Sequence, residues 1–164
     1  MPALRHIKPA ILPLAALLAA LTISACSMGG MAGGSSAAAL APGLSARMDQ
    51  PGASLDRAQA IAMINAYRAT QGRPALTPDA GLDGTAQALA DQYARTGTPP
   101  QTPQDLAGMK LSAGYATFAE TFSGWRNNPA DAAGLTSSAT RAGIAVNYNG
   151  SSTYGTHWVL VLAQ

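Results

Sequence analysis

The chain has 164 residues, which is enough for one domain and a tail. Its formal net charge is +2, but Arg5 and Lys8 lie in an N-terminal segment that we expect to be removed, which leaves eight basic and eight acidic residues. A neutral surface argues against nucleic acid or anionic lipid as a partner.

Residues 1–25 have the features of an export signal, with a short basic region followed by the apolar run 11–21. The segment ends in the sequence I-S-A-C at residues 23–26, which resembles the lipobox of bacterial lipoproteins. The resemblance implies that Cys26 becomes the acylated N-terminus of the mature chain. Because each buried acyl carbon contributes about 0.8 kcal/mol, such an anchor holds a protein on a membrane without a spanning helix. An ordinary signal peptide with an incidental cysteine is the alternative.

The segment after the signal predicts a flexible tether. Cys26 is the only cysteine, so no disulfide can form within the chain. Residues 27–53 are rich in Gly, Ala, Ser and Met and show no sustained apolar period. We therefore expect residues 26–53 to form a lipidated tether with a reach of roughly 30 Å. Ser27 rather than Asp follows the cysteine, and by analogy with the enterobacterial sorting rule this favours the outer membrane, facing the periplasm.

The folded domain is expected over residues 54–164. A first helix is predicted over residues 54–70, with Ser54 as its N-cap. Leu76, in the extended connection that follows, is the expected core anchor. A second helix is predicted over residues 79–95. Two helices joined in this way suggest an α-helical hairpin.

The most strongly marked element is a helix over residues 117–129. Thr117 and Glu120 form a T-x-x-E capping box, in which each side chain accepts a hydrogen bond from the backbone N–H of the other residue. Three aromatic residues then follow at positions i, i+4 and i+7, and they form one stripe. The domain core should form against this stripe, which consists of Phe118, Phe122 and Trp125.

Short elements fill the rest of the domain. Residues 109–113 are a short apolar segment that could be a strand, and residues 129–135 read as one more turn of helix that begins at a proline. Residues 142–148 and 154–162 are β-rich, with a hairpin connection at 149–152. The near-continuous apolar character of the last run predicts a strand covered on both faces. The fold class predicted is α+β, an α-β-α sandwich with a small antiparallel sheet between helical layers.

Short motifs occur along the predicted domain in a fixed order. They are Asn65 with Arg68, Pro74-Ala75-Leu76, Leu82 with Ala86 and Leu89-Ala90, Trp125 with Asn128-Pro129, Gly143-Ile144, and Tyr154 with Trp158. Together they resemble the CAP superfamily of cysteine-rich secretory proteins, venom allergens and pathogenesis-related proteins, also called SCP-like domains. The resemblance covers residues 55–164 and implies an α-β-α sandwich.

The resemblance also implies a site. Family members often carry two His and two Glu in a central cleft, and some bind a divalent metal there. Glu120 stands at one Glu position, whereas Leu89, Met109 and Asp131 stand where the family has His, Glu and His. These four residues are the ligand-binding cleft that the resemblance implies. Because three of them depart from the family pattern, we expect a dismantled cleft with no metal and no cofactor.

Three functions stay open. The leading hypothesis is a monomeric envelope lipoprotein whose CAP-like domain is not an enzyme and binds a small apolar ligand or an envelope component; it predicts an apolar groove near Leu89 and Met109. The second is a hydrolase of peptidoglycan or peptide, with the carboxylates of Glu120 and Asp131 about 5 to 9 Å apart. The third is a structural interaction module with an exposed apolar patch.

Each candidate catalytic residue also has a purely structural explanation. The capping box accounts for Glu120, and a carboxylate in the first turn of a helix accounts for Asp131. His157 is a candidate general base, but a His between a turn and Trp158 on a strand is more often a hydrogen-bonded edge residue. The sequence therefore favours binding over catalysis.

Overall fold

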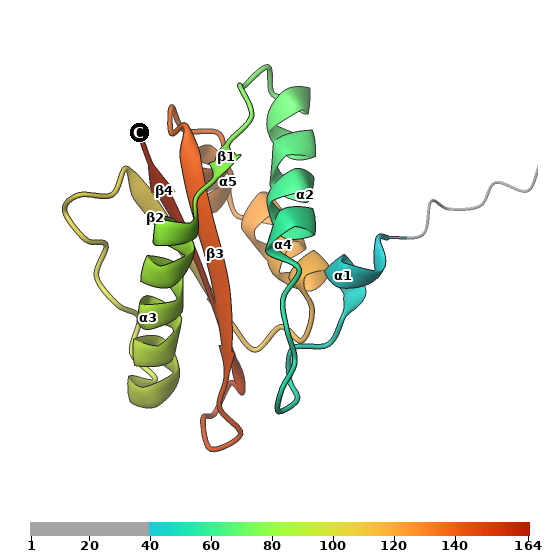
Figure 1. Cartoon of the computed structure of the whole chain (residues 1–164), viewed down its shortest axis with the longest axis vertical. Helices are drawn as coiled ribbons and strands as arrows, with labels where there is room; N and C mark the ends of the chain where they lie inside the picture. Colours follow the sequence, from blue (N-terminus) through green and yellow to red (C-terminus); the bar gives the residue numbers. More distant parts are fainter. Residues whose placement is uncertain (1–39) are drawn as a thin grey trace, which may run out of the picture. The chain divides into compact units, whose positions relative to one another are not determined.

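The computed structural model describes residues 40–164 (Figure 1). The predicted signal, Cys26 and the first part of the predicted tether lie outside the described residues. No helix within residues 40–164 is long and apolar enough to cross a membrane. The elements in chain order are α1 Pro42–Ser45, α2 Arg57–Thr70, β1 Thr77–Pro78, α3 Ala80–Thr96, β2 Gly108–Ala113, α4 Phe118–Asn127, α5 Pro129–Leu135, β3 Arg141–Tyr148 and β4 Thr156–Ala163.

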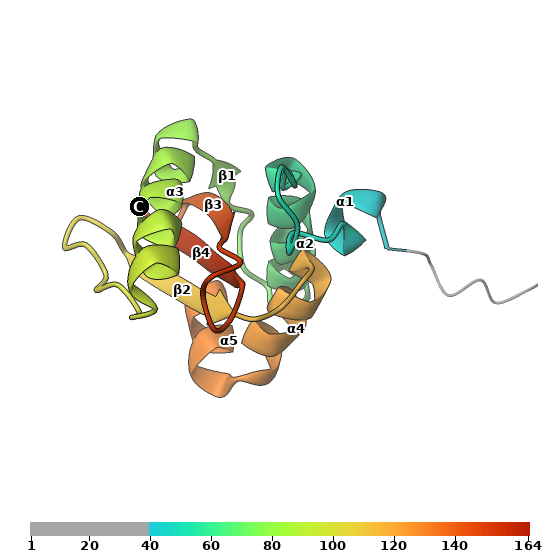
Figure 2. The same ribbon diagram turned by 90° about the horizontal axis from the view of Figure 1, so that it is seen from below.

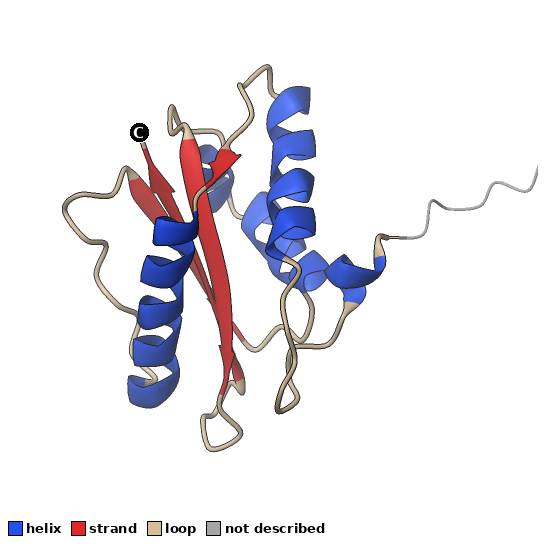
Figure 3. Ribbon diagram, viewed as in Figure 1, coloured by secondary structure: helices blue, strands red, loops and turns tan. Residues whose placement is uncertain are grey.

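The strands form one sheet that lies between helices. Its order is β1-β3-β4-β2, in which β4 is antiparallel to both β3 and β2, and β1 is parallel to β3. Figures 2 and 3 show α3 on one face of the sheet and α2, α4 and α5 on the other. The predicted α+β sandwich is confirmed. The parallel pair was not predicted, because two residues of β1 are too few to show strand alternation.

The helices α2 and α3 do not form the expected hairpin. Ile64 of α2 packs with Trp125 of α4 in one buried cluster. Leu82 of α3 packs with Val161 of β4 in a second cluster on the opposite face. The connection between the two helices includes β1, which pairs at the sheet edge and takes the chain from one face to the other. The hairpin prediction was wrong because local periodicity does not show which face of a sheet a helix covers.

The central strand β4 is covered on both faces, as predicted. All eight of its residues are buried. Because side chains alternate along a strand, successive residues join different clusters. Those facing α2 and α4 include Trp158, Leu160 and Leu162, and those facing α3 include Val159, Val161 and Ala163.

Side-chain caps set the ends of the long helices. Asp56, rather than Ser54, is the N-cap of α2, and its carboxylate accepts a hydrogen bond from the backbone N–H of Gln59 at 2.9 Å. Asp79 caps α3 in the same way, and Gly97 ends this helix in the left-handed conformation. The second helix therefore has nearly the predicted bounds, whereas the first begins later than expected.

The folded region begins earlier than the predicted boundary at residue 54. Leu44 of α1 and Met48 are buried in the core cluster that contains the α4 stripe. The backbone N–H of Met48 also donates to the carbonyl oxygen of Ala116 at 2.7 Å. The described part of residues 26–53 therefore packs on the domain. The sequence did not show this, because two apolar side chains four residues apart are too few to give a periodic signal.

A buried arginine ties α2 to the chain that follows α5. The Arg68 side chain is almost fully buried, and no carboxylate pairs with it within residues 40–164. Burial, together with the nearby charge of Arg73, lowers the pKa of Arg68. The guanidinium donates hydrogen bonds to four carbonyl oxygens, those of Pro74 (2.8 Å), Leu135 (2.7 Å), Ser137 (3.1 Å) and Ala139 (3.2 Å).

We expect Arg68→Lys to lower the free energy of unfolding by about 3 kcal/mol, because an ammonium group cannot reach all four carbonyls and leaves buried acceptors unpaired. Urea denaturation followed by circular dichroism measures this. Arg57→Lys is the matched control, since Arg57 is a half-exposed residue whose Nε donates to one carbonyl, that of Ile144. Equal losses in the two variants would contradict the role assigned to Arg68.

Gly143 of β3 allows α3 to lie directly on the sheet. A Cβ atom at Gly143 would overlap the backbone of Leu82 and Asp83. We expect Gly143→Ala to lower the free energy of unfolding by about 1 to 3 kcal/mol through overpacking. Gly84→Ala is the control, because a Cβ there meets open space; it should leave stability unchanged or raise it by about 0.4 to 1 kcal/mol. The same denaturation measurement compares the two variants. If Gly143→Ala left the free energy of unfolding unchanged, α3 would be free to move away from β3, and the close packing would not matter for stability.

Candidate functional site

Two of the four residues implied by the resemblance pack in the apolar cluster between α3 and the sheet. Leu89 of α3 is only 9% exposed and belongs to the cluster between α3 and the sheet. Met109 of β2 pairs with Val161 and packs against the same cluster. Both side chains serve the packing of α3, and Leu89 lines none of the hollows described below.

Glu120 is held by the predicted capping box, which is confirmed. Its Oε2 atom accepts from both the backbone N–H and the hydroxyl of Thr117, at 3.0 Å each. The Thr117 hydroxyl oxygen accepts in turn from the backbone N–H of Glu120 at 3.2 Å. The carboxylate is thus committed to the start of α4.

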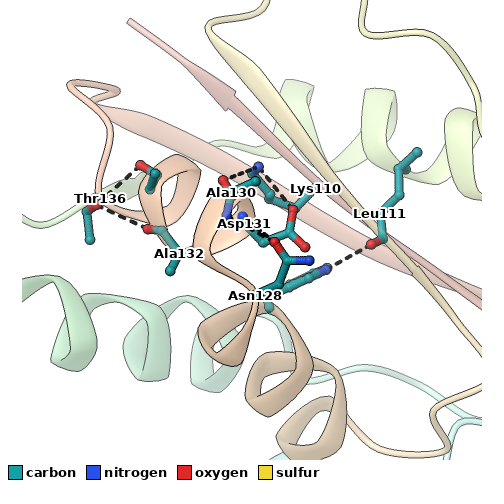
Figure 4. Close-up of polar contacts among 9 residues, drawn as sticks. Lys110, Leu111, Asn128, Ala130, Asp131, Ala132 and Thr136 are labelled. Carbon is teal, nitrogen blue, oxygen red and sulfur yellow. Dashed lines mark hydrogen bonds and ion pairs between the residues drawn. The ribbon is translucent and has the colours of Figure 1, made fainter.

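Asp131 forms an ion pair across the edge of the sheet. Its Oδ1 atom lies 3.2 Å from Nζ of Lys110, a β2 residue whose side chain is only 14% exposed (Figure 4). The same ammonium group donates to the carbonyl oxygen of Ala130 at 3.3 Å. The Asn128 side chain accepts from the backbone N–H groups of Ala130 and Asp131 and so caps α5. This network ties α5 to β2.

The sheet separates the four implied residues into two pairs. Met109 pairs with Val161, which faces α3, whereas the next residue, Lys110, pairs with Leu160, which faces the other helices. Leu89 and Met109 therefore lie on the α3 face, and Glu120 and Asp131 lie on helices that cover the other face.

A hollow of about 380 Å³ lies at the edge strand β2. Met109 and Lys110 both border it, together with Gly134 of α5 and Ser137, which follows that helix. The Ser137 hydroxyl is buried and has no hydrogen-bond partner within the described range. Of the four implied residues, only Met109 lines this hollow.

His157 forms a hydrogen-bonded pair with Ser152 that the sequence analysis did not identify. The imidazole is fully buried, and its Nε2 atom lies 3.1 Å from the Ser152 hydroxyl oxygen. Its ring packs edge-on against Tyr93, with centroids 4.8 Å apart. Burial lowers the pKa of His157. The two residues lie five positions apart at the predicted hairpin connection, and this spacing was the only signal in the sequence for the pair.

Comparison with known proteins identifies the family. Residues 61–162 match the model of the CAP family, described as the cysteine-rich secretory protein family. The chain belongs to the CAP family. The resemblance drawn from the motifs is thereby confirmed. No curated protein matches the sequence.

Solved structures show that the fold of this CAP domain is shared. An outer surface protein from Borrelia burgdorferi has 15% sequence identity and a TM-score of 0.54, over 63% of this chain and 88% of its own. The protein MpPR-1i has 18% identity and a TM-score of 0.51, over 64% and 84%. An extracellular SCP-domain protein from Bacillus anthracis has 13% identity and a TM-score of 0.53, over 66% and 40%. At these identities the likeness shows the fold alone.

The donor set of this CAP domain does not fit the divalent metal that the family resemblance implies. Leu89 has no ligand atom and Met109 offers only a soft thioether, whereas the carboxylates of Glu120 and Asp131 already have partners. Across the described range, no three His, Cys, Asp or Glu side chains form a group that could hold a metal ion.

The buried imidazole predicts a pH dependence of stability. The pKa of His157 in the folded CAP domain lies below the ordinary value of 6.5, so the unfolded chain binds this proton more readily. The free energy of unfolding should therefore fall as the pH is lowered from about 7.5 to 5. NMR titration of the imidazole measures the pKa directly, since His157 is the only His after residue 25. A pKa at or above 6.5 would contradict the assignment.

Proposed function

We propose that this CAP protein is a lipid-anchored protein of the bacterial cell envelope whose domain binds a small amphiphilic molecule and is not an enzyme. The I-S-A-C sequence that ends at Cys26 supports the anchor and, with Ser27, an outer-membrane position facing the periplasm. Two structural neighbours, an outer surface protein and an extracellular protein, agree with a location outside the cytoplasm.

A hollow of about 410 Å³ between α2 and α4 carries the proposal. Its apolar wall consists of Met63, Ala66, Tyr67 and Phe122, and the rings of Tyr67 and Phe122 meet edge-on at 5.8 Å. Ligand sites typically enclose roughly 300 to 1,000 Å³ and are lined mainly by apolar and aromatic side chains. This groove fits the apolar part of a small ligand, although it lies elsewhere than the groove expected near Leu89 and Met109.

The charge beside the groove favours a ligand with an acidic head group. Arg126 is exposed at the end of α4, borders the groove and makes no ion pair or hydrogen bond with another described side chain. A guanidinium group pairs well with a carboxylate. The occupant proposed is therefore a fatty acid or a similar amphiphile, whose chain contacts the apolar wall while its carboxylate meets Arg126.

The alternative of a carboxylate-dependent hydrolase has less support. A general acid or base must lie within hydrogen-bond reach of its substrate. The Glu120 carboxylate instead accepts two hydrogen bonds from Thr117, and the Asp131 carboxylate pairs with Lys110. Both side chains hold helix ends, which favours binding over turnover.

Binding of dansyl-labelled undecanoic acid tests the proposal, with the mature chain (residues 26–164) carrying Cys26→Ser so that no acyl chain is attached. Dansyl fluorescence should show saturable binding to this chain. Ala66→Trp should abolish it by filling the groove, and Arg126→Gln should weaken it about tenfold, since a charge-assisted hydrogen bond is lost. Arg95→Gln, a matched exposed arginine outside the groove, should bind normally. Unchanged binding by Ala66→Trp would overturn the site.

A further inference from the structure

A further hollow, of about 330 Å³, lies between the C-terminal turn of α3 and the loop that joins β3 to β4. Figure 1 shows these two segments side by side at the lower end of the sheet. The hollow differs from the α2–α4 groove in its chemistry, because hydroxyl, amide and guanidinium groups line most of it. Its polar and aromatic lining consists of Arg95, Asn149, Ser151, Ser152, Thr153 and Tyr154.

Hydrogen bonds fix the shape of this hollow before any ligand arrives. The Asn149 amide donates to the carbonyl oxygen of Ala94 at 2.8 Å and so ties the loop to α3. The amide oxygen of Asn149 accepts from the backbone N–H of Ser151 at 3.0 Å. Beneath the loop, the Ser152 hydroxyl is held against the buried His157 ring. A preformed site of this kind avoids the entropic cost of ordering a loop upon binding.

The wall of this hollow presents both hydrogen-bond acceptors and donors. It lies at the C-terminal end of α3, where the helix dipole and the last carbonyl groups place partial negative charge. Arg95, which has no ion pair among the described residues, offsets that charge and presents several donors. Donors and acceptors are thus mixed, and such a wall suits a neutral ligand rich in hydroxyl groups.

An exposed aromatic ring completes the lining. Tyr154 is 55% exposed and borders the hollow. An aromatic ring beside polar groups matches a ligand with one apolar face and a hydroxylated rim, which is the form of a sugar ring. Turn propensity explains Asn, Gly and Ser in this loop. It explains neither the aromatic ring nor the arginine supplied by another element.

We infer that this hollow binds a neutral sugar unit of a glycan, with Tyr154 stacked on the ring and Arg95, Ser151 and Thr153 hydrogen-bonded to its hydroxyl groups. This site is separate from the α2–α4 groove. The protein would then contact an envelope glycan through the loop while the groove holds an amphiphile.

Calorimetric titration of the mature Cys26→Ser chain with chitotriose, and separately with cellotriose, tests this inference. We expect at least one of them to bind with a Kd in the millimolar range or tighter, and to shift the NMR signals of the loop amides. If chitotriose binds and cellotriose does not, the site also recognises the acetamido groups of the sugar. Tyr154→Ala and Arg95→Gln should each weaken binding about tenfold, since both side chains contact the sugar.

Matched controls separate this site from the other surfaces of the protein. Tyr148→Ala removes another exposed tyrosine of the same hairpin, and Arg126→Gln removes an exposed arginine beside the groove; both should bind the sugar normally. Tyr154→Ala should still bind dansyl-labelled undecanoic acid, so the sugar site and the α2–α4 groove are tested independently of each other. Absence of binding by both trisaccharides, equal weakening by Tyr148→Ala, or displacement of the sugar by sodium sulfate bound at Arg95 would overturn the inference.

Discussion

The complete burial of β4 is the constraint on which the arrangement of the domain depends. A strand with apolar side chains on both faces requires a covering layer on each side, because an uncovered face would expose Leu and Val to water. The two helices that flank β1 in the chain therefore lie apart, with α2 on one face and α3 on the other. Gly143 strengthens this arrangement, since its missing side chain lets the α3 backbone contact β3 directly.

Local sequence signals predicted most of the elements because each depends on neighbouring residues alone. The capping box of Thr117 and Glu120, the start of α3 at Asp79 and the hairpin between β3 and β4 are all encoded within a few positions. The features that were missed depend on distant contacts. Leu44 is buried only because α2 and α4 are already in place, and β1 exists only because β3 lies beside it.

The candidate site was less predictable than the fold. A family motif shows where a residue lies along the chain, but it does not show which groups its side chain contacts in the folded protein. By the motif resemblance Glu120 stands at a Glu position of the family, whereas in the structure its carboxylate serves the helix start. The pairing of Ser152 with His157 and the groove beside Arg126 combine residues that carry no shared motif. Such surfaces become visible only when separate elements are placed together.

Strand alternation explains why a polar centre would be hard to rebuild at the family cleft. On β2, Met109 turns toward the α3 cluster, and the next residue, Lys110, turns toward α5 and neutralises Asp131. Restoring a carboxylate at Met109 would place a charge against apolar packing, and it would leave the Lys110 ammonium group with its existing partner. The residues at the implied cleft positions serve the packing of α3, the start of α4 and the edge of the sheet, so the two ligand sites proposed for this protein lie on other surfaces.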